Sequence, residues 1–217
     1  MTGGHVHGGG PPATPGQVSP ARLIATLGGV GALAGALILV VFAATSPAIE
    51  AHRAQRIDAA IREVLRGPER YDTLYVSGST LTTETSVGAE PVYLGRDASG
   101  AATGYAIVAA APGFADIIRV IFGYDPATKT VLGMKVLESK ETPGLGDLIE
   151  KDSAWVSQFV GALAPLRGVK SGRGTGSPAE IDLITGATIS SRAIVRIIND
   201  ALDRLGPALR SGTAVVP

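Results

Sequence analysis

The chain has 217 residues, 45% of them hydrophobic, with 19 basic and 19 acidic residues and a formal net charge of zero. This length accommodates one domain and an anchor. It contains no cysteine, which excludes thiolate iron–sulfur clusters, thioether-linked haem and disulfides. His52 is the only histidine beyond the N-terminal tail, so the domain can build neither a His-based triad nor a His-rich metal site. The balanced charge also argues against a nucleic-acid partner.

Residues 1–21 form a tail rich in Gly, Pro, Thr and His, with almost no apolar side chains. This composition is typical of a disordered segment, because it offers too little apolar surface to bury. His5 and His7 raise the alternative of a metal site. Two histidines in a Gly-rich tail are a weak signal, and we predict no metal.

Residues 22–46 are predicted to form a transmembrane helix. Leu23 to Thr45 is uncharged and strongly apolar, and at about 1.5 Å per residue it can cross a hydrocarbon core of roughly 30 Å. The alternative is a signal peptide, whose only cleavage candidate is Ala43-Ala44-Thr45. Because the apolar run is longer than the core of a signal peptide, we expect an uncleaved span.

After the span, residues 47–70 are predicted to form a juxtamembrane helix. Its segment from Arg53 to Arg66 is amphipathic and ends at Gly67-Pro68. A domain over residues 71–206 follows, with a C-terminal tail over 207–217. Within the domain, strands are predicted at 73–76, 92–94, 104–111, 117–124 and 131–137, a helix at 152–163 with Trp155 in the core, and a flexible Gly-rich loop at 168–179. Strands with few helices and no regular βαβ alternation predict an α+β fold.

A short strand, Ile181 to Ile184, then leads into a helix whose apolar face runs from Ile189 to Leu205 and is predicted to stop at Gly206-Pro207. Thr188 falls at or just before the first turn. The unpaired N–H groups and the helix dipole favour a phosphate or another anion at such a place. The alternative is that Thr188 is only a helix N-cap, which stabilises by about 1 kcal/mol.

The residues Asp182-x-x-Thr185-Gly186-Ala187-Thr188 resemble the flavinylation motif of a known family. This is the FMN-binding domain family that includes RnfG of the Rnf electron-transport complex and NqrC of the sodium-pumping NADH:quinone reductase. The resemblance implies that Thr188 carries FMN through a phosphoester bond, installed by a separate flavin transferase that uses FAD. It also implies cofactor binding by Thr185, Gly186 and Ala187, and transferase recognition through Asp182.

A second resemblance to the same family lies upstream, where residues 141–146 read Glu-Thr-Pro-Gly-Leu-Gly. In the family this loop lies against the flavin ring, which implies ring contacts from Glu141, Thr142 and Leu145. On the residues alone, the segment is a Pro-Gly surface turn after a strand. Glu138 and Glu141 are the only suggestive carboxylate pair; a solvated strand edge is the favoured interpretation over a carboxylate dyad.

Together these resemblances imply a membrane-anchored subunit that relays electrons through covalent FMN in an Rnf-type ion-translocating ferredoxin:NAD oxidoreductase complex. Its partners would be the other membrane and redox subunits. No side chain of the domain has the pattern of a substrate acid or base, so we assign no catalytic residue and do not expect an enzyme on its own. The alternatives are an NqrC-like or other flavinylated relay, and a flavin-free membrane-tethered scaffold.

Two considerations give conflicting predictions for the side of the cytoplasmic membrane on which the domain lies. Arg22 alone precedes the span, whereas Arg53, Arg56, Arg62 and Arg66 follow it. A positive-inside count therefore places the domain in the cytoplasm, although a long following domain can translocate largely regardless of charge. The resemblance implies the outer, periplasmic face, and this is the orientation we expect.

Overall fold

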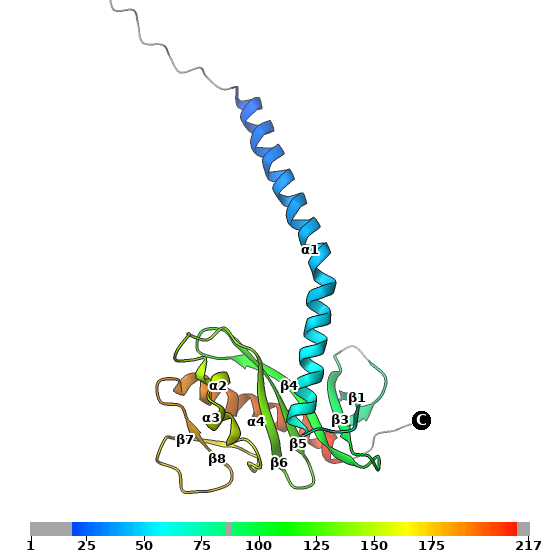
Figure 1. Cartoon of the computed structure of the whole chain (residues 1–217), viewed down its shortest axis with the longest axis vertical. Coiled ribbons are helices and arrows are strands. Elements are labelled where there is room, and N and C mark those ends of the chain that lie inside the picture. Colours follow the sequence, from blue (N-terminus) through cyan, green and yellow to red (C-terminus); the bar gives the residue numbers. More distant parts are fainter. Residues whose placement is uncertain (1–18, 86–87, 212–217) are drawn as a thin grey trace, which may run out of the picture. The chain divides into compact units, whose positions relative to one another are not determined.

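A computed structural model describes residues 19–85 and 88–211, and these divide into two compact units that separate between Ala51 and His52 (Figure 1). Helix α1 covers Pro20–Val64. Most of the predicted disordered tail, with His5 and His7, lies outside the described residues.

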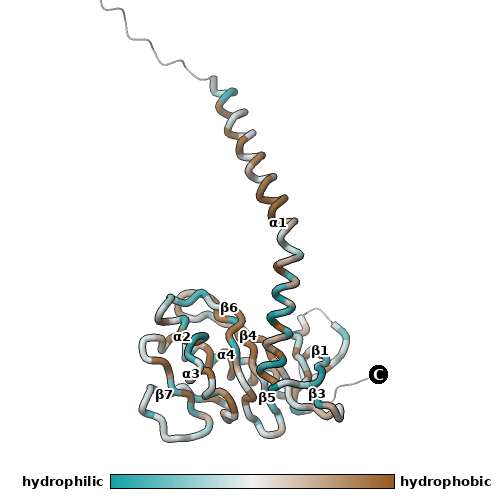
Figure 2. Tube along the Cα trace, in the orientation of Figure 1, coloured by the Kyte–Doolittle hydropathy of each residue, from teal (hydrophilic) through white to brown (hydrophobic). Residues whose placement is uncertain are grey.

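Helix α1 is the one helix within residues 19–85 and 88–211 that is long and apolar enough to cross a membrane, with a mean hydropathy of 2.4 in its most apolar window. The predicted span 22–46 lies inside it, and the apolar stretch is apparent along the first part of the helix in Figure 2. Its large apolar side chains, such as Leu27 and Leu33, are exposed in the structure. A helix with apolar side chains on its outside requires a lipid or protein environment.

The second unit is built on a six-stranded sheet in the order β2-β1-β3-β4-β5-β6, in which every neighbouring pair is antiparallel. The strands are β1 (Arg70–Ser77), β2 (Thr80–Thr82), β3 (Glu90–Arg96), β4 (Ala102–Pro112), β5 (Ile117–Asp125) and β6 (Thr130–Glu138). The remaining elements are α2 (Leu148–Lys151), α3 (Ser153–Ser157), β7 (Arg167–Lys170), β8 (Glu180–Leu183) and α4 (Thr188–Ser211). Strands β7 and β8 form a separate parallel pair. The predicted α+β fold is confirmed.

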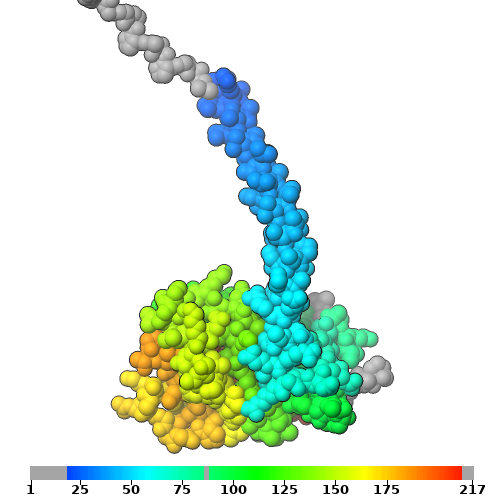
Figure 3. Space-filling model, viewed as in Figure 1, coloured from blue at the N-terminus to red at the C-terminus, as the bar shows by residue number. Residues whose placement is uncertain are grey.

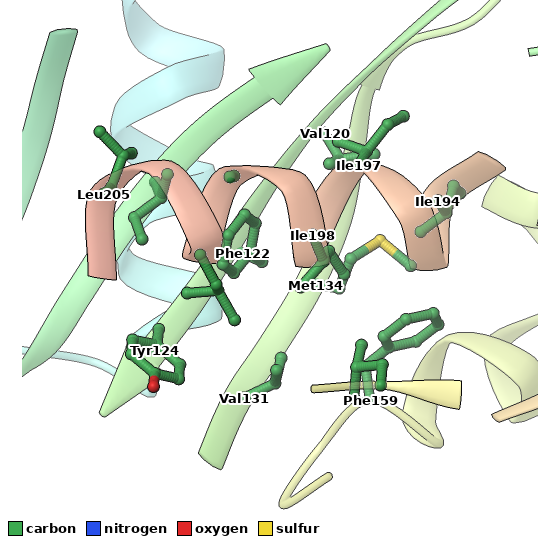
Figure 4. Close-up of a cluster of buried hydrophobic side chains, with 14 of the residues drawn as sticks. Val120, Phe122, Tyr124, Val131, Met134, Phe159, Ile194, Ile197, Ile198 and Leu205 are labelled. Carbon is green, nitrogen blue, oxygen red and sulfur yellow. The ribbon is translucent and has the colours of Figure 1, made fainter. Parts of the chain in front are cut away.

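Helix α4 lies across one face of the sheet and supplies much of the main core. Figure 4 shows its apolar side chains meeting those of β5 and β6, with Phe159 beside them. The labelled buried residues are Val120, Phe122, Tyr124, Val131, Met134, Phe159, Ile194, Ile197, Ile198 and Leu205. Because burying one such side chain contributes about 1.5–3 kcal/mol, this contact is a main source of the domain's stability.

The opposite face of the sheet is covered by the last turns of α1, which lie on the near side of the domain in Figure 3. Ala60, Ile61, Val64 and Leu65 pack there against sheet residues such as Ile121. The approach is close at Gly123, where an added Cβ would lie 2.2 Å from the carbonyl oxygen of Val64. The sheet is therefore sandwiched between α4 and the end of α1.

Several local details differ from the predictions. The helix expected over 152–163 is limited to α3, which is followed by turns, although Trp155 is in the core and stacks edge-on against Phe159. The loop expected over 168–179 begins with strand β7, which the sequence conceals because its short Arg-Gly-Val-Lys run has no apolar alternation. The short elements β2 and α2 were also not predicted.

The predicted helix stop at Gly206-Pro207 is wrong, since α4 continues through both residues to Ser211. Proline removes one helical N–H and usually ends or kinks a helix. Here the next turn places Ala208 and Leu209 in the main core, at 0% and 1% exposure. Tertiary burial therefore outweighs the local stop signal.

Gly123→Ala is expected to destabilise the domain by about 1–3 kcal/mol, because the new methyl group must displace the backbone at Val64. Urea denaturation of the full chain in detergent measures this loss. Ala110→Ser, which adds one atom at an exposed position of β4, is the control and should leave the midpoint unchanged. An unchanged midpoint in Gly123→Ala would mean that the end of α1 does not hold its place on the sheet.

Candidate functional site

The site begins at the turn between β8 and α4. The backbone N–H of Ala187 donates to the carbonyl oxygen of Ile184 at 3.1 Å, and the hydroxyl of Thr188 donates to the same oxygen at 3.2 Å. Gly186 has φ +90°, a conformation that residues other than glycine rarely adopt. The turn presents Thr188 as the exposed first residue of α4.

Three backbone N–H groups are available at this helix start. Those of Thr188, Ile189 and Ser190 have no acceptor among residues 19–85 and 88–211, whereas the next one, of Ser191, donates to the carbonyl oxygen of Ala187 at 2.9 Å. Such groups, together with the helix dipole, form an anion-binding position. The Thr188 hydroxyl is attached at the same end of the helix.

The second sequence motif meets the first one directly. Leu145 lies over Gly186, such that a Cβ on that glycine would be 3.3 Å from a Leu145 methyl carbon. The loop is folded by its own backbone, since the N–H groups of Leu145 and Asp147 both donate to the carbonyl oxygen of Thr142, at 3.2 and 3.3 Å. The two motifs, about 40 residues apart in sequence, therefore form one surface.

A cleft of about 270 Å³ lies where these segments meet, formed by residues of both motifs and of the turn between β4 and β5. Its lining consists of Phe114, Thr142, Leu145, Gly146, Gly186, Ala187, Thr188, Ile189 and Ser190. Three large apolar side chains remain open to solvent there: Phe114 is 65% exposed, Leu145 51% and Ile189 54%. Apolar walls beside a few convergent polar groups are typical of a small-molecule site.

Glu141 lies behind this cleft and is only 5% exposed. One carboxylate oxygen accepts hydrogen bonds from the backbone N–H groups of Phe114 and Ala115, at 2.9 and 3.0 Å, and from that of Asp116 at 3.5 Å. The other accepts the Ser190 hydroxyl at 2.6 Å. Burial raises the pKa of this carboxyl, but the Ser190 hydroxyl and the backbone N–H groups outweigh it, and the net pKa lies below the usual value.

The structure brings most of the predicted site residues together, but not all. Thr142, Leu145, Gly186, Ala187 and Thr188 line the cleft. Glu141 does not line it, since its carboxylate is buried among hydrogen-bond donors.

The other two predicted residues lie away from the cleft lining. Thr185 is exposed on the turn. Asp182 is on β8, where its backbone carbonyl accepts the Trp155 indole N–H at 2.7 Å and its backbone N–H donates to the Gln158 side chain at 2.8 Å.

The favoured interpretation of Glu138 and Glu141 as a solvated strand edge holds for one of them only. Glu138 is exposed and pairs with Arg119 at 3.6 Å, whereas Glu141 is buried. The reason is that the chain turns inward after β6 and meets the donors of the β4–β5 turn.

Several residues of the site were not identified from the sequence. Phe114 is the main one. The available signal in the sequence was its aromatic side chain directly after Pro112-Gly113, in the loop between two predicted strands. Ser190 and Ile189 directly follow the flavinylation motif but belong equally well to a plain helix start. Nothing local in the sequence connects Phe114 or Ser190 with Glu141, because all three come from different segments.

The comparisons with known proteins agree with this geometry. A family model described as FMN-binding domain matches residues 113–203, the segment that contains the cleft. The chain is 32% identical over 165 residues to the G subunit of the ion-translocating oxidoreductase complex of Vibrio vulnificus (strain YJ016), covering 73% of this chain and 76% of that one. It is 31% identical over 185 residues to the protein of the same name in Methanosarcina acetivorans, covering 84% and 92%.

The chain thus carries an FMN-binding domain. It belongs to the family formed by the G subunits of ion-translocating oxidoreductase complexes.

Two crystal structures share the fold. NqrC of Shewanella oneidensis aligns with a TM-score of 0.66 at 16% identity, covering 75% of this chain and 98% of that chain. The C subunit of the Na(+)-translocating NADH-quinone reductase of Parabacteroides distasonis aligns with a TM-score of 0.53 at 21% identity, covering 63% and 76%. At these identities the likeness establishes the architecture.

Glu141→Gln is expected to lower the free energy of unfolding by about 1 kcal/mol at neutral pH, because hydrogen bonds to a charged acceptor are stronger than those to a neutral one. Since the folded-state pKa is lowered, the wild-type advantage is fully present above the usual value of 4.5 and is lost as the pH falls below it.

Urea denaturation between about pH 3 and pH 7, a range that extends to both sides of the usual carboxyl pKa of 4.5, measures the effect. The exposed Glu138→Gln is the control and should follow wild type. An advantage that persists unchanged at the lowest pH would contradict the assignment.

Proposed function

We propose that this chain is the membrane-anchored flavin subunit of an Rnf-type ion-translocating complex, and that it relays electrons through FMN held by a phosphoester bond to Thr188. The observation that carries the proposal is the position of the Thr188 hydroxyl. It is exposed at the start of a 24-residue helix, beside an apolar cleft and three backbone N–H groups that have no acceptor in the part of the chain that the structure describes. Family membership and the FMN-binding domain match support the same conclusion.

The helix start fits the phosphate of FMN. A phosphodiester keeps one negative charge, and the N–H groups of Ile189 and Ser190 point from the first turn of α4 without acceptors among residues 19–85 and 88–211. An anion at such a place is stabilised by about 0.3–1 kcal/mol by the helix dipole. The covalent bond then makes retention independent of this modest energy.

The cleft fits one face of a planar aromatic ring. Phe114, Leu145 and Ile189 offer exposed apolar surface around it. Gly186 and Ala187 keep its floor flat, and Gly186 could not carry a larger side chain without touching Leu145. Stacking on Phe114 would contribute about 0.5–1.5 kcal/mol beyond the buried area.

The Thr188 hydroxyl is the group of this chain that reacts in the attachment step. The Thr188 oxygen attacks the flavin-side phosphorus of FAD while a base of the transferase takes its proton. The new bond joins that oxygen to phosphorus, and the bond to the departing AMP breaks. Nothing is oxidised or reduced. The Thr188 hydroxyl also gives up its hydrogen bond to the carbonyl oxygen of Ile184.

Bound FMN supplies reversible one- and two-electron chemistry, and the protein supplies position and electrostatics. This chain's exposed cleft leaves the bound group accessible to neighbouring subunits, as a relay requires. An Rnf-type assembly is favoured over an NqrC-type one because the relatives from ion-translocating oxidoreductase complexes match at 31–32% identity, whereas the likeness to NqrC is one of fold. We further propose that the flavin transferase recognises Asp182, which lies on β8 just before the turn that leads into α4.

Thr188→Ala is expected to abolish flavin fluorescence on a denaturing gel when the chain is co-expressed with a competent flavin transferase. Thr83→Ala removes an exposed hydroxyl that lies outside the cleft lining and outside both motifs, and it should retain the fluorescence. Fluorescence that survives in Thr188→Ala would refute the attachment site. A dark wild-type band under the same conditions would favour the flavin-free scaffold.

For orientation we propose that the flavin domain lies on the outer, periplasmic face, against the charge count of the flanking arginines. Protease added to intact spheroplasts should then degrade the domain without detergent. A cytoplasmic protein in the same spheroplasts should survive and serves as the control. Protection of the domain until detergent is added would place it in the cytoplasm.

A further inference from the structure

Glu141 joins three segments that are distant in sequence. Its carboxylate accepts from the backbone of Phe114 and Ala115, in the β4–β5 turn, and from the side chain of Ser190, in the first turn of α4. Glu141 itself begins the loop that carries Leu145. Each of these segments contributes a wall of the cleft.

The space around Glu141 is shaped for this carboxylate. A Cβ on Gly113 would lie 2.4 Å from a carboxylate oxygen of Glu141, and a Cβ on Gly146 would lie 2.8 Å from the Cβ of Glu141. Neither glycine has a positive φ, so neither is required by backbone conformation. Gly146 is therefore explained by the room that Glu141 needs, and Gly113 by the room that Glu141 and the buried Ile118 side chain need together, since a Cβ there would also lie 2.5 Å from Ile118.

Two further contacts hold the same turn. Lys140 pairs with Asp116 at 3.5 Å, and the Arg196 guanidinium on α4 donates to the carbonyl oxygen of Pro112 at 2.8 Å. Both contacts lie at the surface, where ion pairs and hydrogen bonds are weakened by water. The buried contact through Glu141 is the stronger constraint, because hydrogen bonds to a charged group in a shielded position contribute more than neutral ones.

We propose that Glu141 is a positioning residue of the flavin site. Its carboxylate connects the β4–β5 turn, which carries Phe114, to Ser190 of α4 and so fixes the distance between the Phe114 ring and Thr188. This inference rests on the proposed function for its flavin part only. Glu141 acts from behind the cleft and is not part of its lining. A carboxylate suits this role because it is an acceptor at both oxygens and can satisfy the backbone donors and the hydroxyl together.

Removing the carboxylate leaves the part-buried backbone N–H groups of the β4–β5 turn and the buried Ser190 hydroxyl without this acceptor, and it frees the turn to move away from α4. Glutamine preserves the shape. Its carbonyl oxygen can accept from the turn, and its NH₂ group can donate to the Ser190 hydroxyl, which rotates to accept. Glu141→Ala and Glu141→Gln therefore separate the loss of the contact from the loss of the charge.

The first measurement is amide hydrogen exchange of the full chain in detergent, in a Thr188→Ala background that carries no covalent flavin. Glu141→Ala should speed exchange at Phe114 and Ala115 by at least about tenfold, because a local opening becomes easier. Glu141→Gln should recover most of this protection, and the exposed Glu138→Gln should match its parent. Unchanged exchange in Glu141→Ala, or equal loss in Ala and Gln, would overturn the proposal whether or not the protein binds flavin.

The second measurement has two parts, both on the covalently bound flavin. One is its visible circular dichroism per mole of flavin incorporated, and the other is its fluorescence anisotropy. Glu141→Ala should lower both signals because the ring loses a fixed wall, and Glu141→Gln should restore them. Normalisation of the circular dichroism to the flavin incorporated removes the effect of a lower yield of folded, flavinylated protein. Recovery in the isosteric Glu141→Gln variant then attributes the loss of signal to the missing contact. Signals identical to wild type in Glu141→Ala would refute a role in positioning the ring.

Gly113→Ala approaches the same contact from the other side, since its methyl group would crowd both the Glu141 carboxylate and the neighbouring Ile118 side chain. It should reproduce the effects of Glu141→Ala on exchange and on the flavin signals. Normal exchange and signals in this variant would contradict the proposal. Absence of flavin from wild type, with the exchange results as expected, would instead refute the proposed function and leave the contact established.

Discussion

The packing of α4 across the antiparallel sheet is the constraint on which the site depends. Because the helix buries an apolar face from Ala193 to Leu209, its rotation and its position along the sheet are both fixed. Its first turn is thereby fixed too, and with it the Thr188 hydroxyl and the backbone N–H groups of Thr188, Ile189 and Ser190. The helix even passes through Gly206 and Pro207 to retain the last part of this contact. A covalent anchor placed on such an element cannot drift relative to the cleft.

A buried carboxylate completes what the helix begins. The sheet places the turn between β4 and β5 near the start of α4, but residues 114–116 of this turn are exposed and core packing does not hold them. Glu141 connects the turn to α4 through charged hydrogen bonds, and Gly113 and Gly146 leave it the room to do so. Phe114 can then remain exposed and still be held in place. An open cleft with a defined shape is what a group that exchanges electrons with neighbouring subunits requires.

The sequence predicts much of this site, for two different reasons. Strands such as β4 and β5 are apparent because apolar β-formers recur in them, and the start of α4 is apparent from its helical apolar spacing. The residues of the flavin motif were found by resemblance. What remained hidden depends on contacts between distant segments: Glu141 has the pattern of a surface turn, Phe114 has no local signal of function, and β7 is a strand only because β8 pairs with it. Local rules likewise misplace the end of α4, whose last turn is stabilised by burial.

The central claim is that Thr188 carries the flavin, and peptide mass spectrometry tests it most directly. Trypsin should release the segment Gly174–Arg192 from the chain purified after co-expression with a flavin transferase. The account predicts that this peptide gains the mass of FMN less one water and that fragmentation assigns the gain to Thr188. A gain assigned to Thr185 or Ser190, or an unmodified peptide from a preparation in which the transferase is active, would contradict it.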